Sequence, residues 1–243
     1  MLNTTNNPTH ANLDSKLRFK KAEKIDALVR KRNNLKGRCM LEVGTGSGFI
    51  AQYFSDNIFG NEGTVAIDVV DERQTLEGYR FQLVQDTNLP FEDGMFDFII
   101  SNHVIEHVGS KDAQINHLNE IFRCLEVGGT FYFAVPNRWG LIEPHYKLPL
   151  LSWLPNDIAS IYTRTFRNTP HYDCKPLSRQ QAIGLLHNSQ FEFVDSTLDA
   201  IKLIGEIEGG LFKKVITKLP KAFWRPLLFI IPTLIFVCRK PSA

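Results

Sequence analysis

The sequence has little net charge and few cysteines. Its 243 residues carry 28 basic and 26 acidic side chains, and the net charge of +2 is too small to predict nucleic-acid binding. No C-x-x-C pair occurs, which excludes a zinc knuckle and a thioredoxin-like site. The cysteines are Cys39, Cys124, Cys174 and Cys238. We expect four free thiols in a reducing, cytoplasmic setting.

Long apolar segments are also missing. Residues 1–10 are polar and lack the apolar stretch of a secretory signal. The longest apolar run, residues 226–238, contains Pro232 and is shorter than the ~20 residues that a membrane-spanning helix needs. We therefore expect this run to form a buried terminal strand.

Apolar residues make up 43% of the chain, which is enough for one core. We expect a disordered segment at 1–13 and a single domain at 14–243. A first helix is predicted at 14–33, with an apolar stripe of Leu17, Ile25, Leu28 and Val29. Further helices are predicted at 49–56, 114–125 and 178–188. Strands are predicted at 38–43, 63–67, 81–85, 96–101, 130–135, 191–196 and 233–239. This alternation predicts βαβ units and a parallel sheet.

The few excess positive charges gather near the start of the chain. Residues 16–38 hold ten Lys or Arg against Glu23 and Asp26. Such a segment could contact phosphate or anionic lipid, but a solvated helix face is the simpler interpretation.

A glycine-rich loop follows the first predicted strand. It reads Glu42-Val43-Gly44-Thr45-Gly46-Ser47-Gly48. Glycines let a ligand approach bare backbone, and the next helix offers free N–H groups. A dinucleotide fingerprint would require glycine at position 49, which is Phe49. The acid before the glycines disfavours a pyrophosphate and suits a cationic nucleoside.

In this pattern the sequence resembles the class I S-adenosylmethionine-dependent methyltransferases. The resemblance covers about residues 38–137 and continues in order beyond the loop. Its further segments are Asp68, Asp86-Thr87, residues 89–97, residues 101–108 and residues 121–129. Val127 stands where the family usually has proline.

The resemblance implies a Rossmann-like α/β fold, with a seven-stranded, mostly parallel sheet flanked by helices and an antiparallel last strand. It implies S-adenosylmethionine as the cofactor. In the family, an acid at the position of Asp68 binds the ribose hydroxyls, and one at Asp86 meets the adenine amine. The implied cofactor-binding residues are Glu42, Val43, Gly44, Thr45, Gly46, Gly48, Asp68, Asp86, Thr87 and Asn102.

The segment after the fourth predicted strand holds the first candidate base. His103 follows Asn102 at the carboxyl edge of the sheet, where α/β proteins bind ligands. A base is needed only if the acceptor must lose a proton. Residues 103–107 also read H-x-x-E-H, a zinc pattern. Because this motif lies inside the methyltransferase pattern, we expect Glu106 and His107 to be structural and predict no metal ligands.

Two insertions depart from a regular βα pattern. Residues 138–176 are rich in proline and aromatic residues and contain His145, a second candidate base. They are expected to form either an acceptor pocket or a cap that only excludes water. Residues 201–224 include a basic amphipathic helix at 211–221. That helix could lie in a membrane interface or pack on the sheet with its lysines in water.

Two sequence motifs are absent, and their absence restricts the class of acceptor that we expect. No N-P-P-Y or N-P-P-F follows the fourth predicted strand, and no Pro-Cys pair exists. We expect a small-molecule, lipid or glycan acceptor, methylated at a hydroxyl, with nucleic acid disfavoured. The protein is expected in the cytoplasm, with a peripheral contact on the inner membrane face if 201–224 binds lipid. Two alternatives stay open: a non-catalytic cofactor-binding or membrane-docking scaffold, and an RNA or protein methyltransferase.

Overall fold

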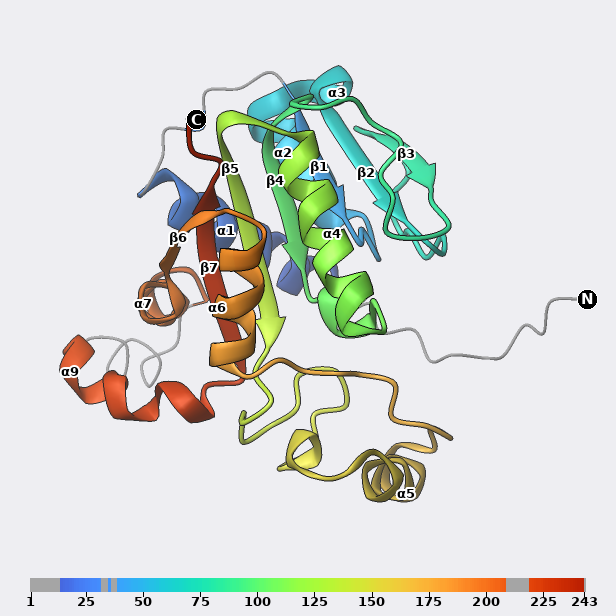
Figure 1. Ribbon diagram of the computed structural model, residues 1–243, viewed down its shortest axis with the longest axis vertical. Coiled ribbons are helices and arrows are strands. Elements are labelled where there is room, and N and C mark those ends of the chain that lie inside the picture. The colour runs from blue at the N-terminus through green and yellow to red at the C-terminus, as the bar shows by residue number, and fades with distance from the viewer. Residues whose placement is uncertain (1–13, 32–34, 36–38, 209–218, 243) are drawn as a thin grey trace, which may run out of the picture.

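The computed structural model describes residues 14–31, 35, 39–208 and 219–242, which form a seven-stranded sheet between two helical layers (Figure 1). The strand order is β3-β2-β1-β4-β5-β7-β6. β7 runs antiparallel to its neighbours β5 and β6, and the other pairs are parallel. The expected Rossmann-like sheet with an antiparallel last strand is confirmed.

The element bounds follow the predicted alternation. The strands are β1 (Met40–Val43), β2 (Thr64–Asp68), β3 (Arg80–Leu83), β4 (Phe96–Asn102), β5 (Leu125–Pro136), β6 (Glu192–Asp195) and β7 (Thr233–Arg239). The helices are α1 (Ser15–Arg30), α2 (Phe49–Phe54), α3 (Gly60–Gly63), α4 (Lys111–Cys124), α5 (Asn156–Arg167), α6 (Arg179–Asn188), α7 (Thr197–Ile207) and α9 (Lys221–Trp224). A π-helical turn covers Ser55–Phe59, and 3-10 turns cover Ile105–His107, Leu151–Trp153 and Arg225–Ile230.

Two hydrophobic cores lie on the two faces of the sheet. On the face covered by α4 and α6, Phe131 and Phe133 of β5 belong to the same buried cluster as Leu118 of α4. On the other face, Tyr132 of β5 shares a cluster with Ile25 of α1 and with residues of α2 and α7. Because helices cover both faces, the central strands β1, β4 and β5 are buried along most of their length instead of alternating between buried and exposed residues.

Helix α1 is shorter than predicted. Asp14 caps it, since its carboxylate accepts a hydrogen bond from the backbone N–H of Leu17 at 3.2 Å. The buried stripe includes Ile25, Leu28 and Val29, as predicted, but Leu17 is 50% exposed. The prediction for Leu17 is wrong, because residues 14–17 at the start of α1 are all exposed, and Ala22 is fully buried instead.

A capping residue accounts for the early start of α4. Ser110 starts α4 three residues earlier than predicted, because its Oγ accepts the N–H of Ala113 at 3.1 Å. Ser178 forms a capping box with Gln181 at the start of α6, where the prediction is nearly right. Strand β3 ends at Leu83, so Asp86 does not close the strand, as the sequence predicts, but lies in the loop beyond it.

The last apolar run is a terminal strand only in its second half. β7 is confirmed, whereas residues 225–230 form a 3-10 turn. Pro226 and Pro232 lack the N–H donor that a sheet ladder needs, so the strand begins after the second proline. Among the described residues, no helix combines the length and the apolar content needed to cross a membrane.

The first insertion forms a cap beyond the carboxyl ends of the parallel strands. In Figure 1 it lies below the sheet, where α5 is labelled. We call residues 138–176 the cap. It has its own small core, made of Tyr146, Leu148, Leu151, Ala159, Tyr172 and Cys174. Most of the amphipathic helix predicted at 211–221 lies outside the described residues, so it stays a prediction.

Candidate functional site

Three glycines shape the turn between β1 and α2. Gly44, Gly46 and Gly48 have φ angles of +75°, +54° and +84°. A Cβ atom on Gly44 would collide with Cγ2 of Val104, and one on Gly48 would collide with the hydroxyl of Tyr79. A side chain at either position would be strained as well as crowded. The turn is therefore restricted to glycine, as expected for a backbone that a ligand approaches closely.

Hydrogen bonds fix this turn against β2. The N–H groups of Gly44 and Thr45 both point to the carbonyl of Ile67, at 2.9 and 3.1 Å. The N–H of Gly46 donates to Oδ2 of Asp68 at 2.8 Å. Asp68 is thus held beside the glycine turn, where the sequence places a cofactor-binding acid.

Glu42 lies under the turn with almost no exposed surface. Its Oε2 accepts the N–H of Ala51 at 3.0 Å, which ties the end of β1 to the start of α2. Burial raises the pKa of Glu42 to about 8, although the cationic Arg18 of α1 acts in the opposite direction. A cation near this carboxyl would favour its charged form.

The buried polar atoms around the turn fit a polar ligand. Within the described part of the chain, Oγ1 of Thr45, Oγ of Ser47 and Oδ1 of Asn102 are buried and have no hydrogen-bond partner. An unsatisfied buried polar atom costs about 1–3 kcal/mol. These atoms lie on the turn and at the end of the neighbouring strand β4, so a polar nucleoside bound there could satisfy them.

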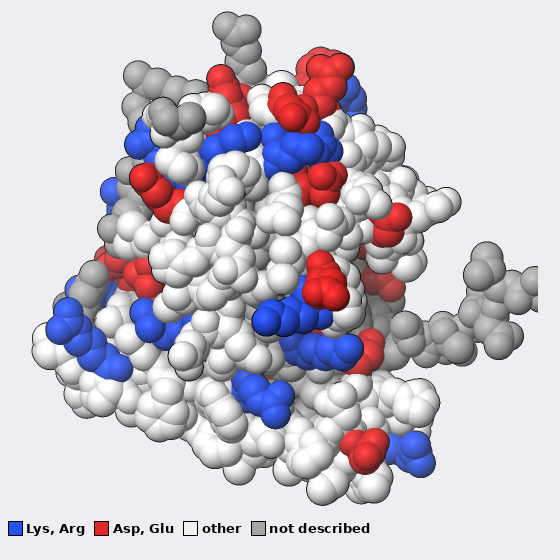
Figure 2. Space-filling view, in the orientation of Figure 1, with Lys and Arg blue, Asp and Glu red and all other residues white. Residues whose placement is uncertain are grey.

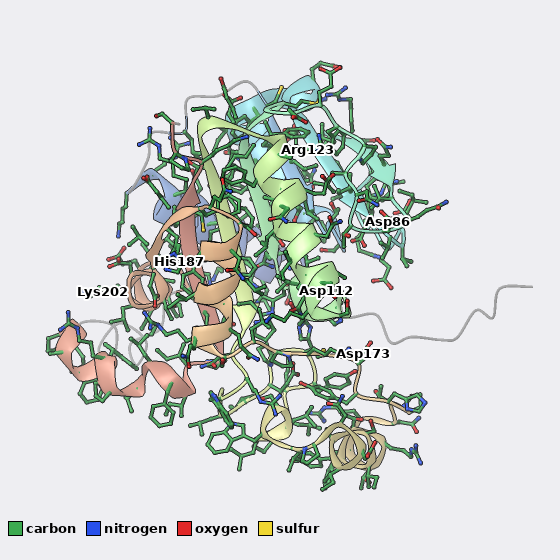
Figure 3. The ribbon with its side chains drawn as sticks, viewed as in Figure 1. Asp86, Asp112, Arg123, Asp173, His187 and Lys202 are labelled. Atoms are coloured by element: carbon green, nitrogen blue, oxygen red, sulfur yellow. The ribbon has the colours of Figure 1, made fainter. Side chains whose placement is uncertain are left out.

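Two predicted cofactor residues lie farther along the same edge. Asp86 is exposed, and its Oδ1 accepts the N–H of Asn88 at 2.7 Å. Oγ1 of Thr87 accepts a hydrogen bond from Asn116 of α4 at 2.8 Å. Figure 3 shows Asp86 on the loop beyond β3, apart from α4. In the described residues, neither side chain is hydrogen-bonded to the glycine turn.

A cluster of three histidines surrounds Glu106 beside the turn. Oε1 of Glu106 lies 2.9 Å from Nε2 of His145, 3.7 Å from Nδ1 of His103 and 3.9 Å from Nε2 of His107. His103 follows β4 in a left-handed conformation with φ of +60°, and His145 comes from the cap. Both candidate bases are thereby brought together, and we call these four residues the histidine cluster.

The cluster adjoins the glycine turn through one residue. Val104 lies between His103 and the 3-10 turn, and its side chain is the one that a Cβ on Gly44 would strike. The N–H of Lys175 in the returning cap segment donates to the Glu106 carbonyl at 2.9 Å. The cap therefore closes over the cluster on the side away from the sheet.

Helix α1 brings two cations to the same edge. Arg18 and Lys21 are partly buried, and they act electrostatically on Glu42 and Glu106 respectively. Burial and the neighbouring Arg18 and Lys24 lower the pKa of Lys21 to about 7. For these two residues the simple expectation of a solvated helix face is wrong, because both side chains are partly buried.

Burial also sets the protonation of His103. Its side chain is 11% exposed, and burial together with the nearby Lys21 and His145 lowers its pKa well below the usual range. His103 is therefore neutral at pH 7. Its Nε2 lies 3.3 Å from the hydroxyl of Thr233, which leaves Nδ1 toward Glu106.

A cavity of about 340 Å³ opens beside the cluster, between the cap and the start of α4. Its lining includes three cations, Lys111, Arg138 and Lys175, together with Tyr172 and Cys174. Figure 2 shows basic side chains gathered on this face, near the N-terminal end of α4. The cavity can hold a substrate-sized group and favours one with negative charge.

The sequence predicts only a structural role for Glu106 and does not place Lys21 or Cys174 near the candidate site. The H-x-x-E-H pattern was the available signal for Glu106. The pattern does not lie on an α-helix, however, since residues 105–107 form a 3-10 turn and α4 begins at Lys111. The carboxylate contacts His145, 39 positions away, because the cap folds back onto the turn.

Comparison with known proteins identifies the family. The methyltransferase domain family matches residues 13–194. An uncharacterized protein of Methanocaldococcus jannaschii is 24% identical over 184 residues, which cover 76% of this chain and 78% of that protein. A probable S-adenosylmethionine-dependent methyltransferase of Mycolicibacterium smegmatis is 33% identical over 108 residues, which cover 42% of this chain and 39% of that protein.

The fold has close counterparts among solved structures. An S-adenosylmethionine-dependent methyltransferase from Mesorhizobium loti superposes with a TM-score of 0.60 at 11% identity. The match covers 91% of this chain and 99% of that structure. At this level of identity the likeness shows the fold alone.

Proposed function

The chain belongs to the methyltransferase domain family, as an S-adenosylmethionine-dependent enzyme, and on this premise we propose that it methylates a hydroxyl group of a small-molecule, lipid or saccharide acceptor. When bound, S-adenosylmethionine supplies an electrophilic methyl group on a sulfonium. The glycine turn, Glu42, Asp68 and Asn102 hold this cofactor. Asp86 and Thr87 follow β3 at the same edge and serve its adenosine end.

The proposed acceptor is a hydroxyl because the site is equipped to remove a proton. A hydroxyl must lose its proton to become a good nucleophile near neutral pH. Nε2 of His145 lies 2.9 Å from a carboxylate oxygen of the buried Glu106, and this contact is the observation that carries the proposal. The carboxylate orients the imidazole and stabilises its protonated form, so His145 is the proposed base and Glu106 its positioning residue.

The remaining groups orient the acceptor and partly cover the histidine cluster. His103 is held in a neutral state, with Nε2 3.3 Å from the hydroxyl of Thr233 and Nδ1 facing Glu106, so it lines the site as an uncharged polar group. The cap covers the cluster and supplies His145 itself. The cations Lys111, Arg138 and Lys175 line the adjoining cavity and favour an acceptor with acidic groups.

Cofactor binding and methyl transfer test the proposal separately. We expect His145→Gln to bind S-adenosylmethionine like the unmodified protein in calorimetry, since the glycine turn is intact. Transfer of labelled methyl groups to small-molecule, lipid and glycan extracts should fall at least 100-fold, the lower range for loss of a general base.

The matched control is His187→Gln. Figure 3 shows His187 on α6, near the end remote from the cap. This variant should keep both cofactor binding and methyl transfer. The proposal fails if His145→Gln transfers methyl groups at the unmodified rate, or if the label enters only protein or RNA.

A further inference from the structure

The histidine cluster has the composition of a metal site. Within the described chain, His103, Glu106 and His145 form one group whose ligand atoms lie within 4.8 Å of one another. His107, His145 and Cys174 form a second such group. The two groups share His145, and Glu106 Oε1 lies within 4 Å of a nitrogen on all three histidines.

The separations are close to those around a bound ion. Metal–ligand bonds of ~2.1 Å place two ligand atoms on one ion about 3–3.5 Å apart. The contacts of Glu106 with His145 and His103 are 2.9 and 3.7 Å, close to this spacing, and the ligand atoms of His103 and His145 lie within 4.8 Å of each other.

The surroundings of the cluster support the same interpretation. Thr233 contacts Nε2 of His103 at 3.3 Å, and an outer hydrogen bond of this kind commonly fixes the orientation of a metal-bound imidazole. A second carboxylate, Glu143, acts electrostatically on His145. Its Oε1 is buried and has no hydrogen-bond partner in the described part of the structure. Two carboxylates would offset the charge of a divalent ion, against the nearby cations Arg18 and Lys21.

We propose that His103, Glu106 and His145 bind a divalent transition-metal ion. Imidazole nitrogens with one carboxylate suit Zn²⁺, Co²⁺ or Fe²⁺, whereas Mg²⁺ and Ca²⁺ prefer all-oxygen sites. The ion would lie at the carboxyl edge of β4, one residue from the glycine turn and under the cap.

The role of the ion rests on the proposed function. An acceptor hydroxyl bound to the ion would have a lowered pKa, as metal-bound water does. Its O–H bond breaks with the proton passing to solvent, and the oxygen lone pair forms the bond to the methyl carbon. The electron pair of the broken carbon–sulfur bond stays on sulfur. With the ion present, His145 is a ligand and no longer the base, and the ion promotes loss of the hydroxyl proton to solvent by lowering the pKa of the bound hydroxyl.

Cobalt binding tests the site without reference to activity. Full-length, tag-free protein is stripped with a chelator and titrated with Co²⁺, and the visible absorption bands report imidazole coordination. Elemental analysis after dialysis against Zn²⁺ gives the number of ions per chain. We expect one ion per chain, with affinity reduced at least tenfold in His145→Gln and in Glu106→Gln.

Control variants keep the outcome clear. His187→Gln should bind Co²⁺ like the unmodified protein, and circular dichroism melts check that each variant is folded. If Glu106→Gln does not fold, the Co²⁺ affinity of His145→Gln alone tests the metal site. The inference is overturned if the unmodified protein binds no ion at 1 mM Co²⁺, or if the cluster variants bind it as well as the control.

The two proposals can fail separately. If no ion binds while His145→Gln still abolishes methyl transfer, the metal site is wrong and the imidazole base stands. If the ion binds at the cluster but no hydroxyl acceptor is methylated, the metal site stands and the proposed acceptor class is wrong.

Discussion

At the scale of single residues, Gly44 gives the sharpest test of the cofactor site. Its φ of +75° and the adjacent Val104 leave no room for a side chain. We expect Gly44→Ala to lower the free energy of unfolding by about 1–3 kcal/mol. Affinity for S-adenosylmethionine should fall at least tenfold, because the backbone that meets the cofactor must shift. Urea unfolding and calorimetry measure the two effects.

Gly184 provides the matched substitution. It lies inside α6 without a positive φ, and a Cβ there would meet no atom within 4 Å. Gly184→Ala should raise the free energy of unfolding by about 0.5–1 kcal/mol, since alanine is the better helix former, and leave cofactor affinity unchanged. Equal loss of affinity in both variants would contradict the assigned role of the turn.

His117 makes stability depend on pH. It is buried, with Nε2 3.3 Å from Oγ of Ser101, and burial lowers its pKa to about 4. Below its usual pKa of 6.5 the unfolded chain takes up a proton that the folded chain does not, so stability is lost as pH falls from 6.5 toward 4.

Between pH 7.5 and 5 this effect amounts to about 2 kcal/mol. His117→Gln keeps a polar group at Ser101 but cannot titrate, so its stability should fall less over the same range. Urea unfolding at both pH values measures the difference. An identical loss in the two proteins would show that His117 does not contribute.

The residues proposed to bind the cofactor follow from local sequence patterns, whereas the contacts on the proposed acceptor side do not. Gly44, Gly48 and Glu42 lie in one short stretch, and their chemistry is visible in sequence order. The contact between Glu106 and His145 depends on the path of the cap, which no local periodicity encodes. The left-handed conformation of His103 is likewise set by tertiary packing, since nothing in its own residue type requires it.

At the scale of elements, the cap is separate from the main cores. Leu151 is fully buried within the small core of the cap. We expect Leu151→Ala to loosen the cap while the sheet stays folded. Trypsin should cut faster at Arg164 and Arg167 of α5, and acceptor-dependent methyl transfer should fall, because His145 depends on the cap for its position.

The comparison is with Leu118→Ala, in the core between α4 and the sheet. That variant should lose about 2–5 kcal/mol of unfolding free energy, the usual cost of such a cavity. Leu151→Ala should change the global transition much less. A loss as large in Leu151→Ala as in Leu118→Ala would show that the cap and the sheet unfold together.

Element type was easier to predict than element bounds. Continuous apolar runs identify strands buried on both faces, as in β4 and β5. Ends depend on caps such as Asp14 and Ser110, whose effect appears only when the hydrogen bond is known. The exposed β3 has fewer apolar residues to fix its length, and its end was misplaced.

At the scale of the whole molecule, the strand order explains why the site lies where it does. β1 lies between β2 and β4, so successive strands are added on one side of β1 up to β3 and on its other side from β4 onward. At such a switch in strand order the carboxyl ends of the two neighbouring strands, here β1 and β4, border a crevice. The glycine turn comes from β1, and Asn102 and His103 come from the end of β4. The cap supplies the other wall, so the proposed cofactor-binding groups belong to the sheet and the proposed acceptor groups largely to the cap.

This division predicts how ligand binding changes global stability. A ligand at 100 times its Kd raises the free energy of unfolding by about 2.7 kcal/mol, provided that it binds only the folded state. S-adenosylmethionine should give this gain in the unmodified protein and the same gain in Leu151→Ala, because its binding groups lie on the sheet. Urea unfolding with and without the cofactor measures both values. A gain that disappears in Leu151→Ala would show that the cap helps to bind the cofactor, and the cap could then no longer be assigned to the acceptor alone.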